Sequence, residues 1–281
     1  MKTILVTGGT DGIGKGLVQY YLKKDYQVIA VGSSNLKGER LKEEAAKLKK
    51  EKNLLFMQAN LSLISENQRV VQTVKEKYTS LDALILCAAS LKPQERYSET
   101  GEGFEFTFAL YYLSRYVLSY ALKELMEKAE NPFVVNVCAP GMKGQVNWSD
   151  IQFKTNYNGQ KVQFHGSRLN DLLGVAFTEN DSVEKIRYIL FNPMAVKTPG
   201  AENMFQGKSF TKRMTRLYYK YKGKTIEETA EIVVKDIQKT AKGGLTAFKQ
   251  DDAVALSMET FDKDNAEKLS KITSGMLKNK S

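Results

Sequence analysis

Short apolar runs alternate with segments of helical periodicity along almost the whole chain. The runs that we expect to form strands are Thr3–Val6, Gln27–Val31, Leu54–Gln58, Ala83–Cys87, Phe133–Val137, Ile186–Phe191 and Leu245–Phe248. The amphipathic segments between and after them are Gly14–Lys24, Leu36–Lys50, Glu66–Tyr78, Phe104–Lys128, Ser167–Phe177, Ile226–Thr240 and Asn265–Leu277. Strands that alternate with helices indicate βαβ units, whose right-handed crossovers place helices on both faces of a parallel sheet. We therefore predict a single domain over residues 1–281, with a Rossmann-type doubly wound α/β fold of about seven parallel strands.

A glycine-rich segment follows the first of these strands, where a doubly wound sheet binds its ligand. It reads Thr7-Gly8-Gly9-Thr10-Asp11-Gly12-Ile13-Gly14. Glycine permits a tight turn and a close approach to a pyrophosphate, and the N-terminus of the next helix offers amide groups to the anion. The spacing differs from the general Gly-x-Gly-x-x-Gly pattern. Because the segment stands between a strand and a helix, we predict that it holds the pyrophosphate of a nicotinamide dinucleotide.

The end of the second strand bears on which nicotinamide nucleotide binds. An NAD site normally has a carboxylate there, which accepts a hydrogen bond from the ribose 2′-hydroxyl. Here the chain reads Val31-Gly32-Ser33-Ser34-Asn35-Leu36-Lys37, with Arg40 in the following turn. Two hydroxyls and a nearby cation suit a 2′-phosphate, and the alternative is that the lysine belongs to a solvated helix face. We predict that NADP(H) is preferred over NAD(H).

Composition limits the remaining classes of function. The chain has 281 residues of which 42% are hydrophobic, enough for one domain with a full core. It contains no apolar run long enough to span a membrane, and the apolar start Ile4-Leu5-Val6 is too short for a signal peptide, so we expect a soluble, cytoplasmic protein. Cys87 and Cys138 each end an apolar run, which indicates buried free thiols, and we expect no metal site.

The net charge of +10 is concentrated in one segment. Lys208–Lys224 contains seven lysines and arginines and no acidic residue. Its apolar residues recur at roughly helical spacing, so one interpretation is a basic amphipathic helix that binds nucleic acid or an anionic membrane. Another is that the charge attracts a small anionic ligand.

With these residues the chain resembles the short-chain dehydrogenase/reductase family, in particular its retinol-dehydrogenase-like branch. The similar segments, besides the glycine motif, are Gly103-Phe104-Glu105 through Ser119, Val134-Val135-Asn136-Val137, Asn192-Pro193-Met194-Ala195-Val196-Lys197-Thr198 and Ala266-Glu267-Lys268-Leu269-Ser270. The resemblance implies a nicotinamide cofactor and a homodimer or homotetramer formed through the helices after strands four and five. It also implies that residues 199–224 form a substrate-loop lid over a small-molecule ligand, and we favour that role over nucleic-acid or membrane binding.

The resemblance also indicates where the family's catalytic side chains should stand. The family uses asparagine, serine, tyrosine and lysine, and the matching positions here are Tyr111, Ala139, Phe164 and Arg168. Phe164 has no hydroxyl to transfer a proton and Ala139 cannot donate to a carbonyl, whereas Arg168 keeps a charge that can hold the nicotinamide ribose. We predict an NADP(H)-binding family member without the usual catalytic residues. The alternative is an active NADP(H)-dependent oxidoreductase that takes its proton from the substrate or from water.

Tyr157 and Lys161 are another possible proton source, because they satisfy the Tyr-x-x-x-Lys spacing. The spacing is useful only if both residues lie one turn apart on the same helix. Asn158-Gly159 is a turn signal, and the stronger helical periodicity begins near Ser167, so we favour Phe164 as the family's tyrosine position. His165, the only histidine, is expected at the pocket rim or on the surface.

Two further positions complete the cofactor site that the resemblance implies. Asn60 stands where the family has an aspartate near the adenine, and Cys87-Ala88-Ala89-Ser90 stands where it has an asparagine-rich turn. The candidate cofactor residues are Gly8, Thr10, Asp11, Gly12, Ile13, Gly14, Ser33, Ser34, Lys37, Asn60, Leu61, Ala88 and Arg168.

Overall fold

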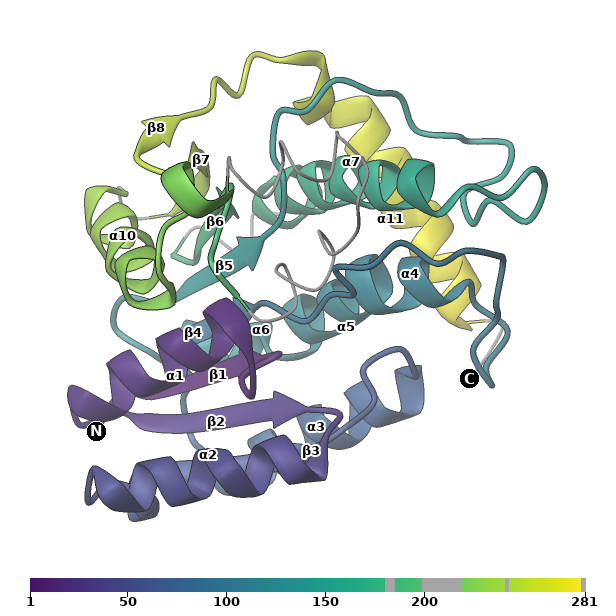
Figure 1. The fold of residues 1–281 in the computed structure, drawn as a ribbon. Coiled ribbons are helices and arrows are strands. Elements are labelled where there is room, and N and C mark those ends of the chain that lie inside the picture. The colour runs from purple at the N-terminus through teal and green to yellow at the C-terminus, as the bar shows by residue number, and fades with distance from the viewer. Residues whose placement is uncertain (180–184, 199–218, 241–242, 279–281) are drawn as a thin grey trace.

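The computed structural model describes residues 1–179, 185–198, 219–240 and 243–278. These residues form a single sheet with helices packed against it (Figure 1). The strand order is β3-β2-β1-β4-β5-β6-β7-β8. The strands are β1 Thr3–Thr7, β2 Gln27–Gly32, β3 Leu54–Gln58, β4 Ala83–Leu86, β5 Phe133–Val137, β6 Arg187–Asn192, β7 Gly244–Lys249 and β8 Asp252–Ala253. Strands β1 to β7 pair in parallel, and β8 runs antiparallel to β7. The doubly wound fold is confirmed, and β8 is an addition too short to give an alternating pattern in the sequence.

Helices cover both faces of the sheet (Figure 1). One face carries α1 Gly12–Lys23, α2 Asn35–Lys47 and α10 Ile226–Lys239, and the other carries α3 Ile64–Lys77, α5 Ser114–Ala121, α7 Gly159–Thr178 and α11 Lys263–Lys278. Neighbouring side chains of a strand point to opposite faces, so Ile4 and Val6 pack under α1 while Leu5 packs in the other layer. The core is therefore two apolar layers separated by the sheet. In the described part of the chain, no helix combines the length and the apolar character needed to cross a bilayer.

The helix predicted over Phe104–Lys128 is divided in the structure. It consists of α4 Phe106–Phe108, a π-helical turn Ala109–Leu113, α5 and α6 Lys123–Glu127. Two side chains bond to carbonyls of the wide turn: Ser114 Oγ donates to Leu110 O at 2.6 Å, and Asn170 Nδ2 donates to Tyr111 O at 2.9 Å. Single π turns of this kind are frequent at functional sites.

Helix α7 begins earlier than its periodicity predicts. Asn158 is its N-cap and accepts a hydrogen bond from Lys161 N at 3.0 Å, so the Asn-Gly pair starts the helix instead of turning the chain away. Gly159 is the first helical residue, and a Cβ there would lie 2.1 Å from Gln94 O. Our expectation of a start near Ser167 was wrong, because glycine serves here for close packing.

Cys87 and Cys138 are both free thiols. Cys138 is buried as expected, whereas Cys87 is half-buried, because it lies at the cleft. Burial raises the pKa of Cys87 to about 12, so its thiol stays protonated at neutral pH. Within the described ranges, no three His, Cys, Asp or Glu side chains gather as metal ligands would.

Candidate functional site

A cleft of about 620 Å³ opens at the carboxyl ends of the parallel strands. Its walls come from the segments after β1 to β6, from the π-helical turn and from the first half of α7. Every candidate cofactor residue listed from the sequence lines this cleft except Arg168. Ligands of doubly wound sheets bind at this edge, so the cleft is the candidate cofactor site.

The glycine motif brings the end of β1 close to its neighbours. Gly8 and Gly12 have φ values of 64° and 50°, in the left-handed region where glycine is favoured. A Cβ on Gly8 would lie 3.0 Å from Ala88 N, and a Cβ on Gly14 would lie 2.4 Å from Gly8 O. The turn therefore requires glycine, and it leaves the first amides of α1 at the cleft, as a pyrophosphate site needs.

Asp11 and Lys37 connect the two helices at the adenosine end of the cleft. Asp11 caps α1, since its Oδ1 accepts from Gly12 N at 2.7 Å, and its Oδ2 forms an ion pair with Lys37 Nζ. Burial alone would raise the pKa of Asp11, but the hydrogen bonds from Lys37 and Gly12 keep it below its usual value. Ser34 caps α2 by accepting from Lys37 N at 3.4 Å. A 2′-phosphate bound here would share the Lys37 ammonium with Asp11.

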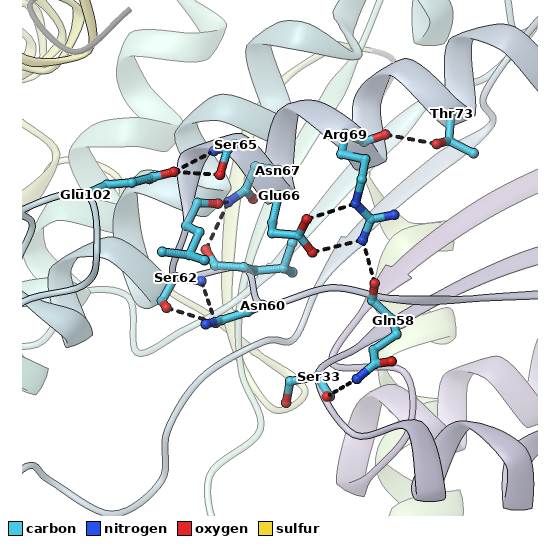
Figure 2. Close-up of polar contacts among 12 residues, drawn as sticks. Ser33, Gln58, Asn60, Ser62, Ser65, Glu66, Asn67, Arg69, Thr73 and Glu102 are labelled. Atoms are coloured by element: carbon cyan, nitrogen blue, oxygen red, sulfur yellow. Dashed lines mark hydrogen bonds and ion pairs between the residues drawn. The ribbon is translucent and has the colours of Figure 1, made fainter.

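Figure 2 shows the polar contacts that fix the ends of β2 and β3. Asn60 Oδ1 accepts from Ser62 Oγ at 2.8 Å and from Ser62 N at 3.2 Å. Gln58 Nε2 donates to Ser33 O at 3.2 Å, and Arg69 Nη2 donates to Gln58 O at 2.6 Å. Both lone pairs of Asn60 Oδ1 are thus used within the protein, and the group that Asn60 can offer to an adenine is its Nδ2 amide donor.

Phe164 and Ala139, which the sequence matches to the family's tyrosine and serine, both line the cleft. Phe164 lines the cleft with 56% of its surface exposed, and Ala139 lines it from the segment after β5. That they replace the family's tyrosine and serine stays a prediction from the sequence.

Arg168 lies outside the cleft wall. It is 3% exposed, its Nη2 donates to Ala139 O at 2.9 Å, and its Nη1 forms an ion pair with Asp171 Oδ2 at 2.7 Å. The predicted contact with the nicotinamide ribose is not supported, because a buried carboxylate one turn along α7 takes the guanidinium instead. The sequence comparison fixed its position but not its partner.

Asp171 binds a loop that contributes to the cleft wall. Burial raises its pKa to about 7, although the Arg168 guanidinium acts in the opposite direction. Its Oδ2 also accepts from Gly141 N at 3.1 Å, in the loop whose next residue, Met142, lines the cleft. The Arg168–Asp171 pair therefore holds this loop against α7.

Tyr157 and Lys161 do not form a catalytic pair. Tyr157 precedes the N-cap of α7 and so lies outside the helix that contains Lys161, and neither residue lines the cleft. The Tyr157 hydroxyl donates to Glu105 Oε1 at 2.8 Å, and Glu105 is fully buried. Burial raises the pKa of Tyr157 to about 12. Tyr157 anchors the segment before α7, and the interpretation of this pair as a proton source is wrong in this geometry.

The expectation that His165 lies at the pocket rim or on the surface is wrong, because the residue is buried. It is 5% exposed, its Nε2 accepts from Asn147 N at 3.2 Å, and its ring packs against Phe153 with the centroids 5.0 Å apart. Burial lowers its pKa to about 4, so the imidazole is neutral near pH 7. It does not line the cleft.

The sequence reasoning missed a pair of hydroxyls in the cleft. Tyr111 and Ser167 both line it, and their hydroxyl oxygens are 3.3 Å apart. Tyr111 had been identified only as the replacement of an asparagine. No sequence signal pairs the two residues, which are 56 positions apart; in the structure, a Cβ on Gly166 would lie 2.6 Å from the Tyr111 ring.

A buried polar network behind this pair was also missed. Arg115 donates to Asn136 Oδ1 and, at 2.9 Å, to Val137 O. Asn136 Nδ2 donates to Asn170 Oδ1 at 2.9 Å and to Tyr188 Oη at 3.1 Å. The signal was an asparagine within the apolar run of β5 and an arginine on an apolar helix, since polar groups are rarely buried without partners.

Most of the predicted lid over residues 199–224 lies outside the described residues, which begin again at 219. Its last part returns to the cleft, where Tyr219 lines the wall. Lys224 N donates to Ala195 O at 3.0 Å and Lys197 N donates to Lys224 O at 2.8 Å, which joins the segment to the chain after β6.

Fold and cleft together define an α/β protein of the dinucleotide-binding class. Residues 2–165 match the family described as short chain dehydrogenase, and the chain belongs to this short-chain dehydrogenase/reductase family. Its similar relatives support the retinol-dehydrogenase-like branch. Membership implies a nicotinamide cofactor.

Curated relatives and solved structures agree with this assignment. The chain is 28% identical to bovine (Bos taurus) dehydrogenase/reductase SDR family member 12 over 73% of its own length and 64% of that protein's. It is 24% identical to the Saccharomyces cerevisiae uncharacterized oxidoreductase YKL107W over 94% and 84% of the two lengths, and 26% identical to mouse (Mus musculus) retinol dehydrogenase 12 over 61% and 54%. The crystal structure of the KRED1-Pglu enzyme superposes with a TM-score of 0.66 at 15% identity, covering 87% of this chain and all of that one (100%). The last likeness is one of fold.

Proposed function

We propose that the protein binds NADP(H) in the cleft and does not perform the family's tyrosine-dependent proton transfer. The observation that carries the proposal is Phe164, which is exposed on the wall of the same cleft in which the glycine turn lies. A phenyl ring has no proton to exchange at this position.

The preference for the 2′-phosphate rests on the end of β2. Ser33, Ser34 and Lys37 line the cleft there, and no carboxylate follows β2 before Lys37 to accept from a ribose 2′-hydroxyl. Asp11 is the nearby carboxylate, and it is engaged by Lys37 and by Gly12 N. Hydroxyl donors and an ammonium favour an anion over a neutral hydroxyl at this place.

Different residues of the cleft would bind different parts of the nucleotide. The first amides of α1 would bind the pyrophosphate, Asn60 Nδ2 would donate to an acceptor nitrogen of the adenine, and Ala88 would support the adenosine from below. When bound, a reduced nicotinamide nucleotide supplies a hydride, which needs an electrophile at its ring but no protein acid.

A second candidate function is reduction of a polarised carbon–carbon double bond, which the two hydroxyls of Tyr111 and Ser167 in the cleft favour. Hydride would add to the β-carbon of an α,β-unsaturated carbonyl compound, and the electron pair of the double bond would move through the α-carbon to the carbonyl oxygen. Water would then protonate the α-carbon. The products are the saturated carbonyl compound, hydroxide and the oxidised nucleotide, so no protein side chain has to lose a proton.

Titration calorimetry with NADPH and NADH tests the first proposal. We expect NADPH to bind, and to bind more tightly than NADH. Absence of binding of both nucleotides would refute it. A panel of ketones, aldehydes and α,β-unsaturated carbonyl compounds then separates the two functions: oxidation of bound NADPH by the unsaturated compounds supports the second, and no oxidation by any of them eliminates it.

A further inference from the structure

Two hydroxyl groups meet on the cleft wall although they lie far apart in the sequence. Tyr111 Oη and Ser167 Oγ are 3.3 Å apart, and either can donate to the other. Ser167 Oγ also lies 3.4 Å from Gln163 O, which accepts the serine proton. In this arrangement Tyr111 donates to Ser167, and an acceptor that entered the cleft would take over a hydroxyl proton.

A buried positive charge lies directly behind the phenol. The guanidinium carbon of Arg115 is 4.4 Å from the centroid of the Tyr111 ring, and Arg115 is 1% exposed. Its hydrogen-bond acceptors are neutral: Asn136 Oδ1, Val137 O and Ala88 O. Among the described residues, the ion pairs do not include Arg115.

An uncompensated buried cation is costly, and its field favours negative charge nearby. The buried carboxyl group of Asp171 is already paired with Arg168. An anionic oxygen in the cleft beside Tyr111 would gain from the Arg115 field as well as from the two hydroxyls.

Tyr111 is held by three contacts, one to its backbone carbonyl and two to its ring. Asn170 Nδ2 donates to Tyr111 O at 2.9 Å, the Arg115 guanidinium covers one face of the ring, and the ring lies so close to Gly166 that a Cβ there would be 2.6 Å away. Tyr111 is also the central residue of the π-helical turn Ala109–Leu113. Donors fixed before the ligand arrives bind a developing charge with little reorganisation.

We propose that the Tyr111 and Ser167 hydroxyls, with the Arg115 guanidinium behind them, form an oxyanion-binding site for a small conjugated ligand that carries an enolate or phenolate oxygen. The site deepens the proposed function, because it rests on the same cleft and names the class of molecule bound beside the nucleotide. A carbonyl oxygen that gains charge during reduction belongs to the same class.

The protonation of Tyr111 suits this role. Burial raises its pKa to about 12, while Arg115 acts in the opposite direction. The phenol therefore stays protonated through the neutral range and can donate a hydrogen bond to an anionic ligand there. It acts as a fixed donor, not as an acid that must be recharged.

The test uses 4-nitrophenol, whose anion absorbs in the visible range and whose neutral form does not. It is titrated into the full-length protein, with and without NADP+, at a pH where the free probe is mostly neutral. We expect bound probe to show the absorbance of the anion. Tyr111→Phe should weaken binding of the anion about tenfold or more, since hydrogen bonds to charged groups are the stronger ones. Ser167→Ala should weaken it less.

Tyr120→Phe is the matched control, because it removes a tyrosine hydroxyl from α5, the helix that follows the π-helical turn, at a residue that does not line the cleft. It should bind the probe like the unaltered protein. Binding of the probe in its neutral form, or equal anion affinity in Tyr111→Phe, Ser167→Ala and the unaltered protein, would overturn the proposal. If Tyr111→Phe does not fold, as judged by its thermal transition, the Ser167→Ala comparison decides. Because the probe needs no nucleotide, failure of NADPH to bind would refute the proposed function and leave this result readable.

Discussion

The ammonium group of Lys37 forms an ion pair with the carboxylate of Asp11, joining the first turn of α2 to the N-cap of α1. Both residues line the cleft, and both side chains are about half exposed. If NADPH binds as proposed, its 2′-phosphate would compete with Asp11 for the Lys37 ammonium.

Lys37→Gln should weaken NADPH binding about tenfold and leave NADH binding nearly unchanged, because a charge-assisted hydrogen bond is lost only with the 2′-phosphate. Asp11→Asn should strengthen NADPH binding, since it frees Lys37 and retains a side chain that caps helices well. Calorimetric titration of both nucleotides measures the ratio. Lys42→Gln, on the exposed face of α2, is the control. Equal loss of both nucleotides in Lys37→Gln would contradict the assignment.

Gly14→Ala should abolish nucleotide binding and lower the midpoint of thermal unfolding. The new Cβ would lie 2.4 Å from Gly8 O, so the glycine turn has to open. Gly275→Ala is the matched control within α11, where a Cβ meets nothing within 4 Å. That change should raise stability by about 0.5–1 kcal/mol, as glycine is unfavourable within a helix. Nucleotide binding that survives Gly14→Ala would show that the turn is not the pyrophosphate site.

Tyr157→Phe should lower stability by about 1–3 kcal/mol and leave nucleotide affinity unchanged. The substitution leaves the buried Glu105 Oε1 without the donor that lies 2.8 Å away, and an unsatisfied buried carboxylate is costly. Chemical denaturation and NADPH titration measure the two effects. A loss of hydride-transfer activity without a loss of stability would restore Tyr157 as a proton source.

Asp171→Asn should change how stability depends on pH. The folded-state pKa of Asp171 is raised from 3.8 to about 7, so its contribution to stability is full below pH 4 and is lost as the pH rises to about 7. The unfolding free energy of the unaltered protein relative to Asp171→Asn should therefore fall across this range and then level off.

His165 provides the opposite dependence and serves as the comparison. Its pKa is lowered from 6.5 to about 4, so its contribution is full above pH 6.5 and is lost as the pH falls towards 4. The two groups offset each other between these values in the unaltered protein, and Asp171→Asn should reveal the histidine as a rise in stability with pH. A flat difference between the two proteins would show that the pKa of Asp171 is not raised in the folded state.

Much of the fold was predictable because its signals are local. The ends of the seven predicted strands differ from the predicted runs by at most one residue, since each is an apolar run bounded by polar or glycine residues. The break in the helix over Phe104–Lys128 was not predictable, because the carbonyls of the π turn are satisfied in part by Asn170, from α7. Local periodicity contains no record of such a partner.

The candidate site also has a part that the sequence predicts and a part that it does not. Its cofactor residues follow strand ends, and their shared cleft follows from the topology. The orientation of Arg168 depends on Asp171, and the Tyr111–Ser167 contact joins residues 56 positions apart, so neither could be read from spacing. The preference for NADP(H), the lid and the oligomeric state stay predictions.

The π-helical turn has a consequence for how this protein can change. An α-helix advances by about 100° per residue, so one residue more or less within a turn rotates everything beyond it by that angle. Here the π-helical turn sets two orientations. Tyr111, inside the turn, lines the cleft, and α5, which follows the turn, packs in the core against α3. Deletion of one residue between Ala109 and Leu113 would turn either Tyr111 away from the cleft or α5 away from the core. Substitutions at Tyr111 can alter the chemistry of the cleft and leave the core in register.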